Sequence, residues 1–290
     1  MGNPLILDRL IMAVMAGMDE VDPDQGRPTD STLKTADGTL VTKTDKRSEA
    51  AMLEVLQGIP DTIVRAEESD IGGIDSPYVI LVDPLDGTGA FATGSATSTV
   101  IAACYDTATK RLTACVIGEP AKGRIWYATD ETPTLLQWHS EEGDAYAPIK
   151  VDTEWTDRNR DIGEKDYIFL DVAHGFKNGL DKFQMSAFLM TLVQDNIKFH
   201  VPGSNGLIHA LVANGAKVAA GSISTAKGGP WDFCGALLVT QAGGFCRGFR
   251  KESGRLYEHD ALDPVGCDFL ITANSKTILD KLTVKLIASY

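Results

Sequence analysis

Two successive apolar patterns constrain the fold of this chain. Short apolar runs separated by turn residues come first, and we expect strands at 62–67 and 78–83 followed by an antiparallel meander at 98–106, 111–120 and 124–129. Strand-length and helix-length runs then alternate, at 167–172, 180–195, 197–201, 205–215, 217–223, 231–244, 268–274 and 276–288. A meander followed by alternation predicts an α/β (α+β) protein with two α/β lobes, at residues 1–150 and 151–290.

The region before the meander combines helical and turn-rich patterns. Residues 1–17 predict an amphipathic helix, and residues 44–58 predict a second helix with Asp45 as its N-cap. The polar segment 19–36 between them is expected to be a mobile loop that leads to a hairpin at Asp37-Gly38.

Composition excludes several classes of function. The formal net charge of −13 argues against nucleic acid or an anionic membrane as the main partner. No apolar run approaches the roughly 20 residues of a membrane span. Five widely spaced cysteines in apolar segments predict free thiols in a reducing, cytoplasmic compartment: Cys104, Cys115, Cys234, Cys246 and Cys267. Three histidines lack companions at metal-ligand spacing and are expected to be structural: His174, His200 and His209.

The segment LVDPLDGTGAF, residues 81–91, brings two carboxylates close together. Asp83 stands where we expect a buried strand to end, because Pro84 cannot continue a ladder. Asp83, Asp86 and the carbonyl of Leu85 are oxygen ligands of the kind that magnesium prefers, and the glycines at 87 and 89 allow an anion to approach the backbone. The alternative is an Asx-type turn, in which each aspartate accepts hydrogen bonds from nearby backbone N–H groups.

Two other acidic segments favour the metal site. Glu67 and Glu68 end a predicted strand, although paired surface glutamates are the common alternative. Asp232 is expected to open a helix, where the helix dipole stabilises its charge and Trp231 fixes its orientation, although it could be an N-cap alone.

Together these segments resemble the inositol monophosphatase family of magnesium-dependent, lithium-sensitive phosphatases. The resemblance rests on VTKTDKRSE at 41–49, EES at 67–69, VDPLDGT at 82–88 and WDFCGALLVTQAGG at 231–244, which occur in the family's order. It implies a layered α/β/α/β/α sandwich of the inositol monophosphatase and fructose-1,6-bisphosphatase type. It also implies a homodimer that hydrolyses a small phosphorylated metabolite, similar to inositol monophosphate, by metal-activated attack of water.

The resemblance implies a set of two to three Mg²⁺ ions. Glu67, Asp83 and the Leu85 carbonyl would bind one ion. Asp83, Asp86 and Asp232 would bind a second, and a third, weaker ion would lie near Glu67. Mn²⁺ would substitute for Mg²⁺, and Li⁺ or Ca²⁺ would inhibit.

The resemblance also implies catalytic and phosphate-binding roles. Asp45 and Thr88 would orient and deprotonate the attacking water, with Glu67 as a third catalytic residue. Backbone N–H groups of Gly87 and Thr88 would hold the phosphate. Three residues would line the substrate pocket by their position, although a helix cap would explain the last two equally well: Gly203, Ser204 and Asn205.

Two departures from the family pattern leave the substrate open. Gly89-Ala90 replaces the common Thr-Asn, and the segment before Trp231 contains Thr225 and Lys227 where inositol monophosphatases have a carboxylate that contacts inositol hydroxyls. Lys227 is either a solvated loop residue or a contact for a second anionic group. The alternatives are therefore a 3′(2′),5′-bisphosphate nucleotidase, a fructose-1,6-bisphosphatase or an NADP phosphatase. A non-catalytic metal-binding protein, or surface loops stabilised by calcium, are the alternatives outside the enzyme class.

Overall fold

A computed structural model describes most of the chain. It covers residues 4–34, 40–69, 76–138, 148–153, 157–171, 182–215, 219–225 and 229–290. The chain divides into two compact units, Met1–Lys150 and Val151–Tyr290, and each is described by itself. Among the described residues, no helix has both the length and the apolar character required to cross a membrane.

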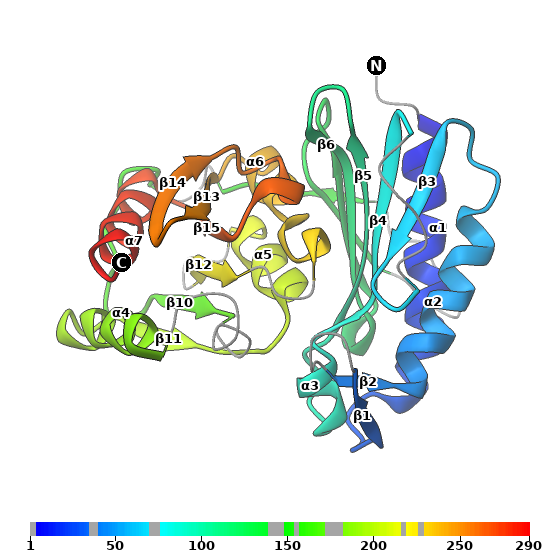
Figure 1. The fold of residues 1–290 in the computed structure, drawn as a ribbon, viewed down its shortest axis with the longest axis horizontal. Coiled ribbons are helices and arrows are strands. Elements are labelled where there is room, and N and C mark those ends of the chain that lie inside the picture. Colours follow the sequence, from blue (N-terminus) through cyan, green and yellow to red (C-terminus); the bar gives the residue numbers. More distant parts are fainter. Residues whose placement is uncertain are drawn as a thin grey trace. The chain divides into compact units, whose positions relative to one another are not determined.

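The first unit is built on a seven-stranded sheet of order β3-β4-β5-β6-β7-β8-β9 (Figure 1). Its strands are β3 (Thr62–Ala66), β4 (Tyr78–Asp86), β5 (Thr99–Asp106), β6 (Arg111–Glu119), β7 (Arg124–Thr129), β8 (Leu135–Trp138) and β9 (Ile149–Lys150). All neighbours are antiparallel except β3, which is parallel to β4. The predicted meander over β5, β6 and β7 is confirmed, and the sheet continues beyond it into β8 and β9.

Two long helices, α1 (Pro4–Val21) and α2 (Lys43–Leu56), cover one face of this sheet (Figure 1). Their apolar positions recur at helical spacing and form one core with side chains from β4 and β6, such as Val82 and Val116. Leu10 of α1 and Met52 of α2 are completely buried in this core. Both predicted helices are therefore present.

The segment 19–36 contains more regular structure than expected. Helix α1 continues to Val21, a 3₁₀ turn η1 follows at Asp22–Asp24, and strand β1 (Ser31–Leu33) pairs antiparallel with β2 (Leu40–Thr42). The prediction of one loop over the whole segment was wrong, because the apolar face of α1 extends four residues beyond Gly17. The turn expected at Asp37-Gly38 lies outside the described residues.

Strand β4 also differs from its prediction, because it does not end at Asp83. The ladder with β5 pairs Asp83 with Ile101, shifts register, and resumes at Asp86, which pairs with Thr99. Pro84 lies within this irregularity, where its missing N–H costs no ladder hydrogen bond. The strand therefore carries both aspartates on one continuous, locally bent element.

The second unit is built on a six-stranded sheet of order β11-β10-β12-β15-β13-β14 (Figure 1). Its strands are β10 (Tyr167–Leu170), β11 (Lys198–His200), β12 (Ala219–Thr225), β13 (Phe245–Glu252), β14 (Arg255–His259) and β15 (Phe269–Ala273). Strand β10 is parallel to both of its neighbours, and the remaining pairs are antiparallel. The sheet is therefore mixed, with a parallel half and an antiparallel half.

Helices cover both faces of this second sheet. Alternate residues of β15 enter different cores: Phe269 and Ile271 pack in the core that contains α4 (Lys182–Gln194) and α7 (Lys276–Ala288). Leu270 packs with Phe233 in another core, which contains the first residue of α6 (Ala236–Gln241). The alternation of strands and helices that the sequence predicts is confirmed for this part of the chain.

The sequence analysis missed the hairpin of β13 and β14 in the second unit. Its turn is Ser253-Gly254, and both residues have positive φ, 50° and 78°. This is the backbone of a two-residue hairpin turn, which polar residues next to glycine favour. The readable signal was the Ser253-Gly254 pair itself, a polar residue followed by glycine.

Candidate metal and phosphate site

The bend in β4 buries two carboxylates close together. Asp83 is 3% exposed and Asp86 is 6% exposed, and a carboxylate oxygen of each lies within 4.8 Å of one from the other. The Leu85 N–H donates to Asp83 Oδ1 at 3.0 Å, so the Asx-type turn that the sequence offered as an alternative is present at Asp83. Thr99 Oγ1 donates to Asp86 Oδ2 at 2.9 Å. These bonds fix both side chains but leave two buried acidic groups beside each other.

Helix α2 fixes the bend from outside the sheet. Ser48 Oγ donates to the carbonyl oxygen of Pro84 at 2.6 Å, and both residues are buried. This bond satisfies a carbonyl that the shifted ladder leaves without its usual partner. The orientation of the Asp83–Asp86 segment therefore depends on a residue 36 positions earlier in the chain.

A third carboxylate, Glu67, joins Asp83 from the neighbouring strand. Because β3 is parallel to β4, Glu67 directly follows the strand end beside Val82, to whose carbonyl its N–H donates at 3.1 Å. The Glu67 and Asp83 carboxyl groups lie within hydrogen-bonding distance, which requires a proton or a cation between them. Burial raises the pKa of Glu67, while Lys34, whose Nζ is 2.8 Å from Glu67 Oε1, opposes this rise.

The neighbouring Glu68 belongs to the same charged group. Lys34 Nζ also lies 2.5 Å from Glu68 Oε1, and the Glu68 N–H donates to Glu49 Oε2 of α2 at 2.9 Å. Burial raises the pKa of Glu68 to about 7, against the opposing effect of Lys34. Glu68 is therefore not the freely solvated surface glutamate that the sequence offered as an alternative.

Asp45 and Thr88 contact each other, as their predicted pairing requires. Thr88 Oγ1 donates towards Asp45 Oδ1 at 2.9 Å and lies 3.0 Å from the Leu85 carbonyl oxygen. Asp45 is completely buried, and this burial raises the pKa of Asp45 although hydrogen bonds from Thr42 and Thr88 lower it. The buried Asp45 carboxylate therefore has a raised pKa and accepts a hydrogen bond from the Thr88 hydroxyl.

Asp45 does not cap helix α2, which corrects the sequence prediction. Thr42 is the N-cap, and its side chain accepts from the backbone N–H groups of Thr44 and Asp45. Asp45 is the third helical residue and accepts from the Thr42 N–H at 2.8 Å, so the two residues form a reciprocal capping box. The spacing Thr-x-x-Asp at 42–45 was the signal for this arrangement.

Gly87 links the bend to the short helix α3 (Thr88–Ala92). Its φ of +88° lies in the left-handed region, which favours glycine. Its carbonyl accepts from the Phe91 N–H at 2.9 Å, which leaves the Gly87 and Thr88 N–H groups at the start of a helical turn. Gly89 has no such backbone requirement, because a Cβ atom built there would meet no atom within 4 Å.

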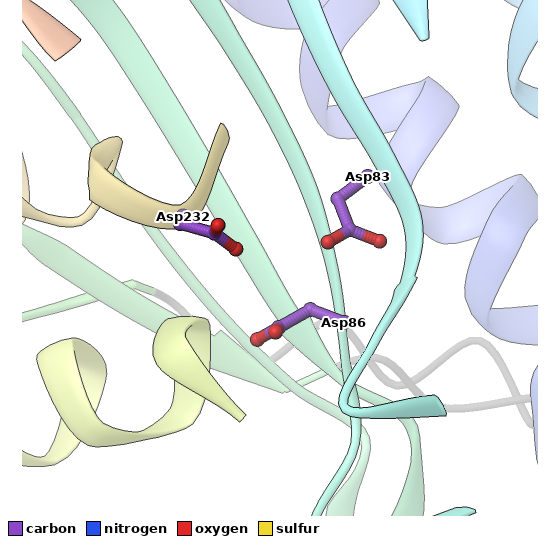
Figure 2. A group of neighbouring side chains, drawn as sticks. All are labelled: Asp83, Asp86 and Asp232. Carbon is purple, nitrogen blue, oxygen red and sulfur yellow. The ribbon is translucent and has the colours of Figure 1, made fainter. Parts of the chain in front are cut away.

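In the second unit, Asp232 lies in the 3₁₀ helix η3 (Pro230–Phe233). The Gly229 N–H donates to Asp232 Oδ2 at 3.2 Å, and Asp232 is 6% exposed. A Cβ atom at Gly229 would lie 2.5 Å from the Trp231 ring, so the ring fits only against glycine. The prediction of a single helix over 231–244 was wrong, because the 3₁₀ helix η3 and the helix α6 are separate elements. Asp232 is the third residue of η3 and does not open a helix. Figure 2 shows the side chains of Asp83 and Asp86 on β4 and of Asp232 on η3.

The predicted substrate-pocket residues form the start of helix α5 (Asn205–Ala213). Gly203 has a φ of +84°, and Ser204 is the N-cap, with its Oγ accepting from the Leu207 N–H at 3.1 Å. Asn205 Nδ2 donates to Asp171 Oδ2 at 2.9 Å. The cap explanation therefore holds for Ser204, whereas Asn205 instead orients a carboxylate that the sequence analysis did not consider.

Three other residues that the sequence analysis named are not part of the acidic group or lie outside the described residues. Thr225, the last residue of β12, is buried, and Lys227 lies outside the described residues. His209 is completely buried and its Nε2 is 3.0 Å from Ser224 Oγ, which agrees with the structural role expected for it.

Sequence comparison identifies related proteins. The sequence profile described as the inositol monophosphatase family matches residues 10–266. A stretch of 57 residues is 46% identical to the inositol-1-monophosphatase of Synechocystis sp., covering 19% of this chain. This match spans 20% of the length of that relative.

Solved structures show the same fold at low sequence identity. An IMPase from Thermotoga maritima is 20% identical with a TM-score of 0.73, and the match covers 98% of this chain and 97% of that one. An IMPase/NADP phosphatase complexed with Mg²⁺ and phosphate is 17% identical with a TM-score of 0.68, covering 97% and 95%. These structural matches establish the fold and, at such identities, no more than the fold.

Proposed function

Because the chain belongs to the inositol monophosphatase family, we propose that it is a Mg²⁺-dependent phosphomonoesterase of small phosphorylated metabolites. The observation that carries this proposal is the pair of buried acidic groups, Asp83 and Asp86, with a carboxylate oxygen of each within 4.8 Å of one from the other. A fold has no use for two such carboxyl groups unless a positive charge accompanies them. Divalent cations with a preference for oxygen ligands fit this donor set.

We assign the metal ligands by position in the family motifs. Glu67, Asp83 and the Leu85 carbonyl would hold one ion, and Asp83, Asp86 and Asp232 would hold a second. A third ion would bind near Glu67, where Lys34 now supplies positive charge at 2.8 Å. When bound, Mg²⁺ supplies positive charge that stabilises the phosphate and makes water more acidic.

The chain's own residues would move the proton of the attacking water. Thr88 Oγ1 would accept that proton while its own hydrogen passes to Asp45 Oδ1, along the existing 2.9 Å contact. Burial prepares Asp45 for this step, because it raises the pKa of the accepting carboxylate. Glu67 would act beside them by orienting the water.

Other groups would bind the substrate. The backbone N–H groups of Gly87 and Thr88 would donate to the phosphate oxygens at the start of α3. Gly203, Ser204 and Asn205 would line the pocket for the rest of the metabolite. An inositol monophosphate-like compound is our first choice of substrate, and a bisphosphorylated nucleotide, fructose 1,6-bisphosphate and NADP are the alternatives.

Three further expectations belong to this proposal. The enzyme would be a cytoplasmic homodimer, Mn²⁺ would replace Mg²⁺, and Li⁺ or Ca²⁺ would inhibit. The oligomeric state and the cation effects can be measured alongside the same assays, by size-exclusion chromatography with light scattering and by exchange of the cation.

The proposal is tested by measuring phosphate release from a panel of inositol, sugar and nucleotide phosphates, with Mg²⁺ and with EDTA. Asp83→Asn should lower turnover by about a hundredfold or more, because metal-ion catalysis supplies several kcal/mol. Asp106→Asn is the matched control. Asp106 forms the same local turn, accepting from the Ala108 N–H at 2.8 Å, at the other end of the ladder between β4 and β5, where it pairs with Tyr78.

The two variants separate a metal ligand from a turn residue. Equal activity of wild type and Asp83→Asn would show that Asp83 only forms the turn. If Mg²⁺ raised the melting temperature but no phosphate were released, the chain would be a metal-binding protein and the proposed activity would be wrong.

A further inference from the structure

The parallel half of the second sheet contains a place where ligands bind in α/β folds. The chain leaves the carboxyl end of β10 through α4 towards β11, on one side of β10. It leaves the carboxyl end of the adjacent parallel strand β12 through η3 and α6 towards β13, on the other side. Connections that diverge from two adjacent parallel strands open a crevice at their carboxyl ends, where such sheets bind ligands.

Asp171 stands at this crevice. It directly follows Leu170, the last residue of β10, and its N–H donates to the Ile223 carbonyl of β12 at 3.0 Å. Its own carbonyl accepts from Thr225 Oγ1, at the carboxyl end of β12, at 3.3 Å. The backbone of Asp171 is therefore fixed across the divergence point by two contacts with one strand.

The side chain of Asp171 is fixed as well. Asn205 Nδ2, at the start of α5, donates to Asp171 Oδ2 at 2.9 Å. Asp171 is 3% exposed and Asn205 is also 3% exposed, and this exposure of Asp171 equals that of Asp83. An ionised carboxylate accepts several hydrogen bonds at once, so holding Asn205 is compatible with accepting from a ligand.

We infer that Asp171 is a specificity-determining residue that accepts hydrogen bonds from hydroxyl groups of the substrate; this rests on the proposed phosphatase function. The described strand β12, Ala219–Thr225, contains no Asp or Glu, so Asp171, which directly follows the adjacent strand β10, is the carboxylate at these two strand ends. A carboxylate favours O–H donors and repels a second phosphate. The substrate class is therefore a hydroxyl-rich monophosphate, such as a polyol, sugar or ribose phosphate, with no second phosphate at this position.

A test of Asp171 must remove the negative charge of its side chain and keep the shape of that side chain. The substitution Asp171→Asn keeps a side-chain oxygen that can accept from Asn205 Nδ2, so it preserves the fixed geometry while removing the charge. Asp263→Asn is the matched control, because Asp263 is a buried carboxylate of the same unit with a side-chain hydrogen bond, to His259 at 3.1 Å.

The experiment compares kcat and KM of wild type, Asp171→Asn and Asp263→Asn in Mg²⁺, with two kinds of substrate. The first kind is hydroxyl-bearing: inositol 1-phosphate, glucose 1-phosphate and 2′-AMP. The second is phenyl phosphate, which has no hydroxyl group outside the phosphate. Asp171→Asn should lower kcat/KM for the best hydroxyl-bearing substrate about tenfold to a hundredfold, mainly through KM, because a hydrogen bond to a charged group is lost. Phenyl phosphate should change less than about threefold, and Asp263→Asn should distinguish neither kind.

Each other outcome overturns the inference in a recognisable way. Equal losses on both kinds of substrate would show that Asp171 acts only through the packing of α5 and the sheet. No loss on the hydroxyl-bearing substrates, or a wild type active on phenyl phosphate alone, would show that this carboxylate contacts no hydroxyl group. A wild type inactive on every compound would instead refute the proposed function, and the inference would fail with it.

Discussion

Replacing Thr88 with valine removes one hydroxyl group and changes the shape of the side chain very little. That hydroxyl donates towards Asp45 Oδ1 at 2.9 Å and is 3.0 Å from the Leu85 carbonyl. Asp45 retains its two contacts with Thr42, so the variant interrupts the proposed proton path without releasing the carboxylate.

The expected losses in catalysis and in stability differ in size. General acid–base catalysis contributes about 10²- to 10⁴-fold, so kcat should fall by this factor, equivalent to roughly 3–5 kcal/mol of barrier. The free energy of unfolding should fall by only about 1 kcal/mol, because one hydrogen bond is lost and Thr88 is partly exposed to compensating water. Activity should therefore fall far more than stability.

Steady-state phosphate release in Mg²⁺ and urea unfolding measure the two quantities. Thr88→Ser keeps a hydroxyl and should retain most of the activity. Thr93→Val is the matched control, because the exposed Thr93 hydroxyl bonds only locally, to the Ala90 carbonyl at 2.8 Å, at the other end of α3. Activity of Thr88→Val within about threefold of wild type would refute the assigned role, since loss of a proton-transfer group should lower the rate by about a hundredfold or more.

Two further predictions concern groups outside the proton path. Ser48→Ala should lower the free energy of unfolding by about 1–2 kcal/mol, because it leaves the buried Pro84 carbonyl unsatisfied; urea unfolding measures this, and Ser76→Ala, which breaks an exposed bond, should cost much less. Burial lowers the pKa of His209 from 6.5 to about 3, so the unfolded chain binds a proton that the folded chain refuses and stability falls as the pH falls from 6.5 towards 3. Between pH 6.5 and 5 His209 should contribute about 2 kcal/mol of lost stability, because the raised pKa values of Glu67 and Glu68 act with the opposite sign and only the difference between variants isolates it. Urea unfolding should show this contribution as the difference in pH dependence between wild type and His209→Gln, and the exposed His200→Gln should behave like wild type; an identical pH dependence of wild type and His209→Gln would contradict the assignment.

The strands and helices that the sequence predicted correctly are those with strong local patterns. The meander over β5 to β7 and the alternation after residue 167 follow from apolar periodicity and turn residues, which act within a few positions. The hairpin at Ser253-Gly254 had a comparable local signal and was overlooked. The break at residues 234–235 between η3 and α6 had none, because a continuous apolar pattern does not distinguish a 3₁₀ turn from the first turn of an α-helix.

The parts of the site that the sequence did not predict depend on distant contacts. Pro84 was expected to end a strand, but the ladder resumes because Ser48 of α2 holds the intervening carbonyl. Lys34 gave no signal within its own polar segment, and its role depends on Glu67 and Glu68, more than thirty positions later. Asp171 was not considered because its partners, Ile223, Thr225 and Asn205, lie on a strand and a helix that only the fold brings to it.

The contacts of Asp83 separate what the fold needs from what a ligand needs. An Asx-type turn requires only an acceptor oxygen, which asparagine provides as well as aspartate, so the Leu85 N–H bond explains the shape of this residue but not its charge. The charge lowers stability, because Asp83 is buried beside the carboxyl group of Glu67. Such a charge makes physical sense when a cation completes the group, and this is why Asp83→Asn should leave the turn intact while removing the Mg²⁺-dependent rise in melting temperature. An equal rise in the variant would show that the cation binds elsewhere.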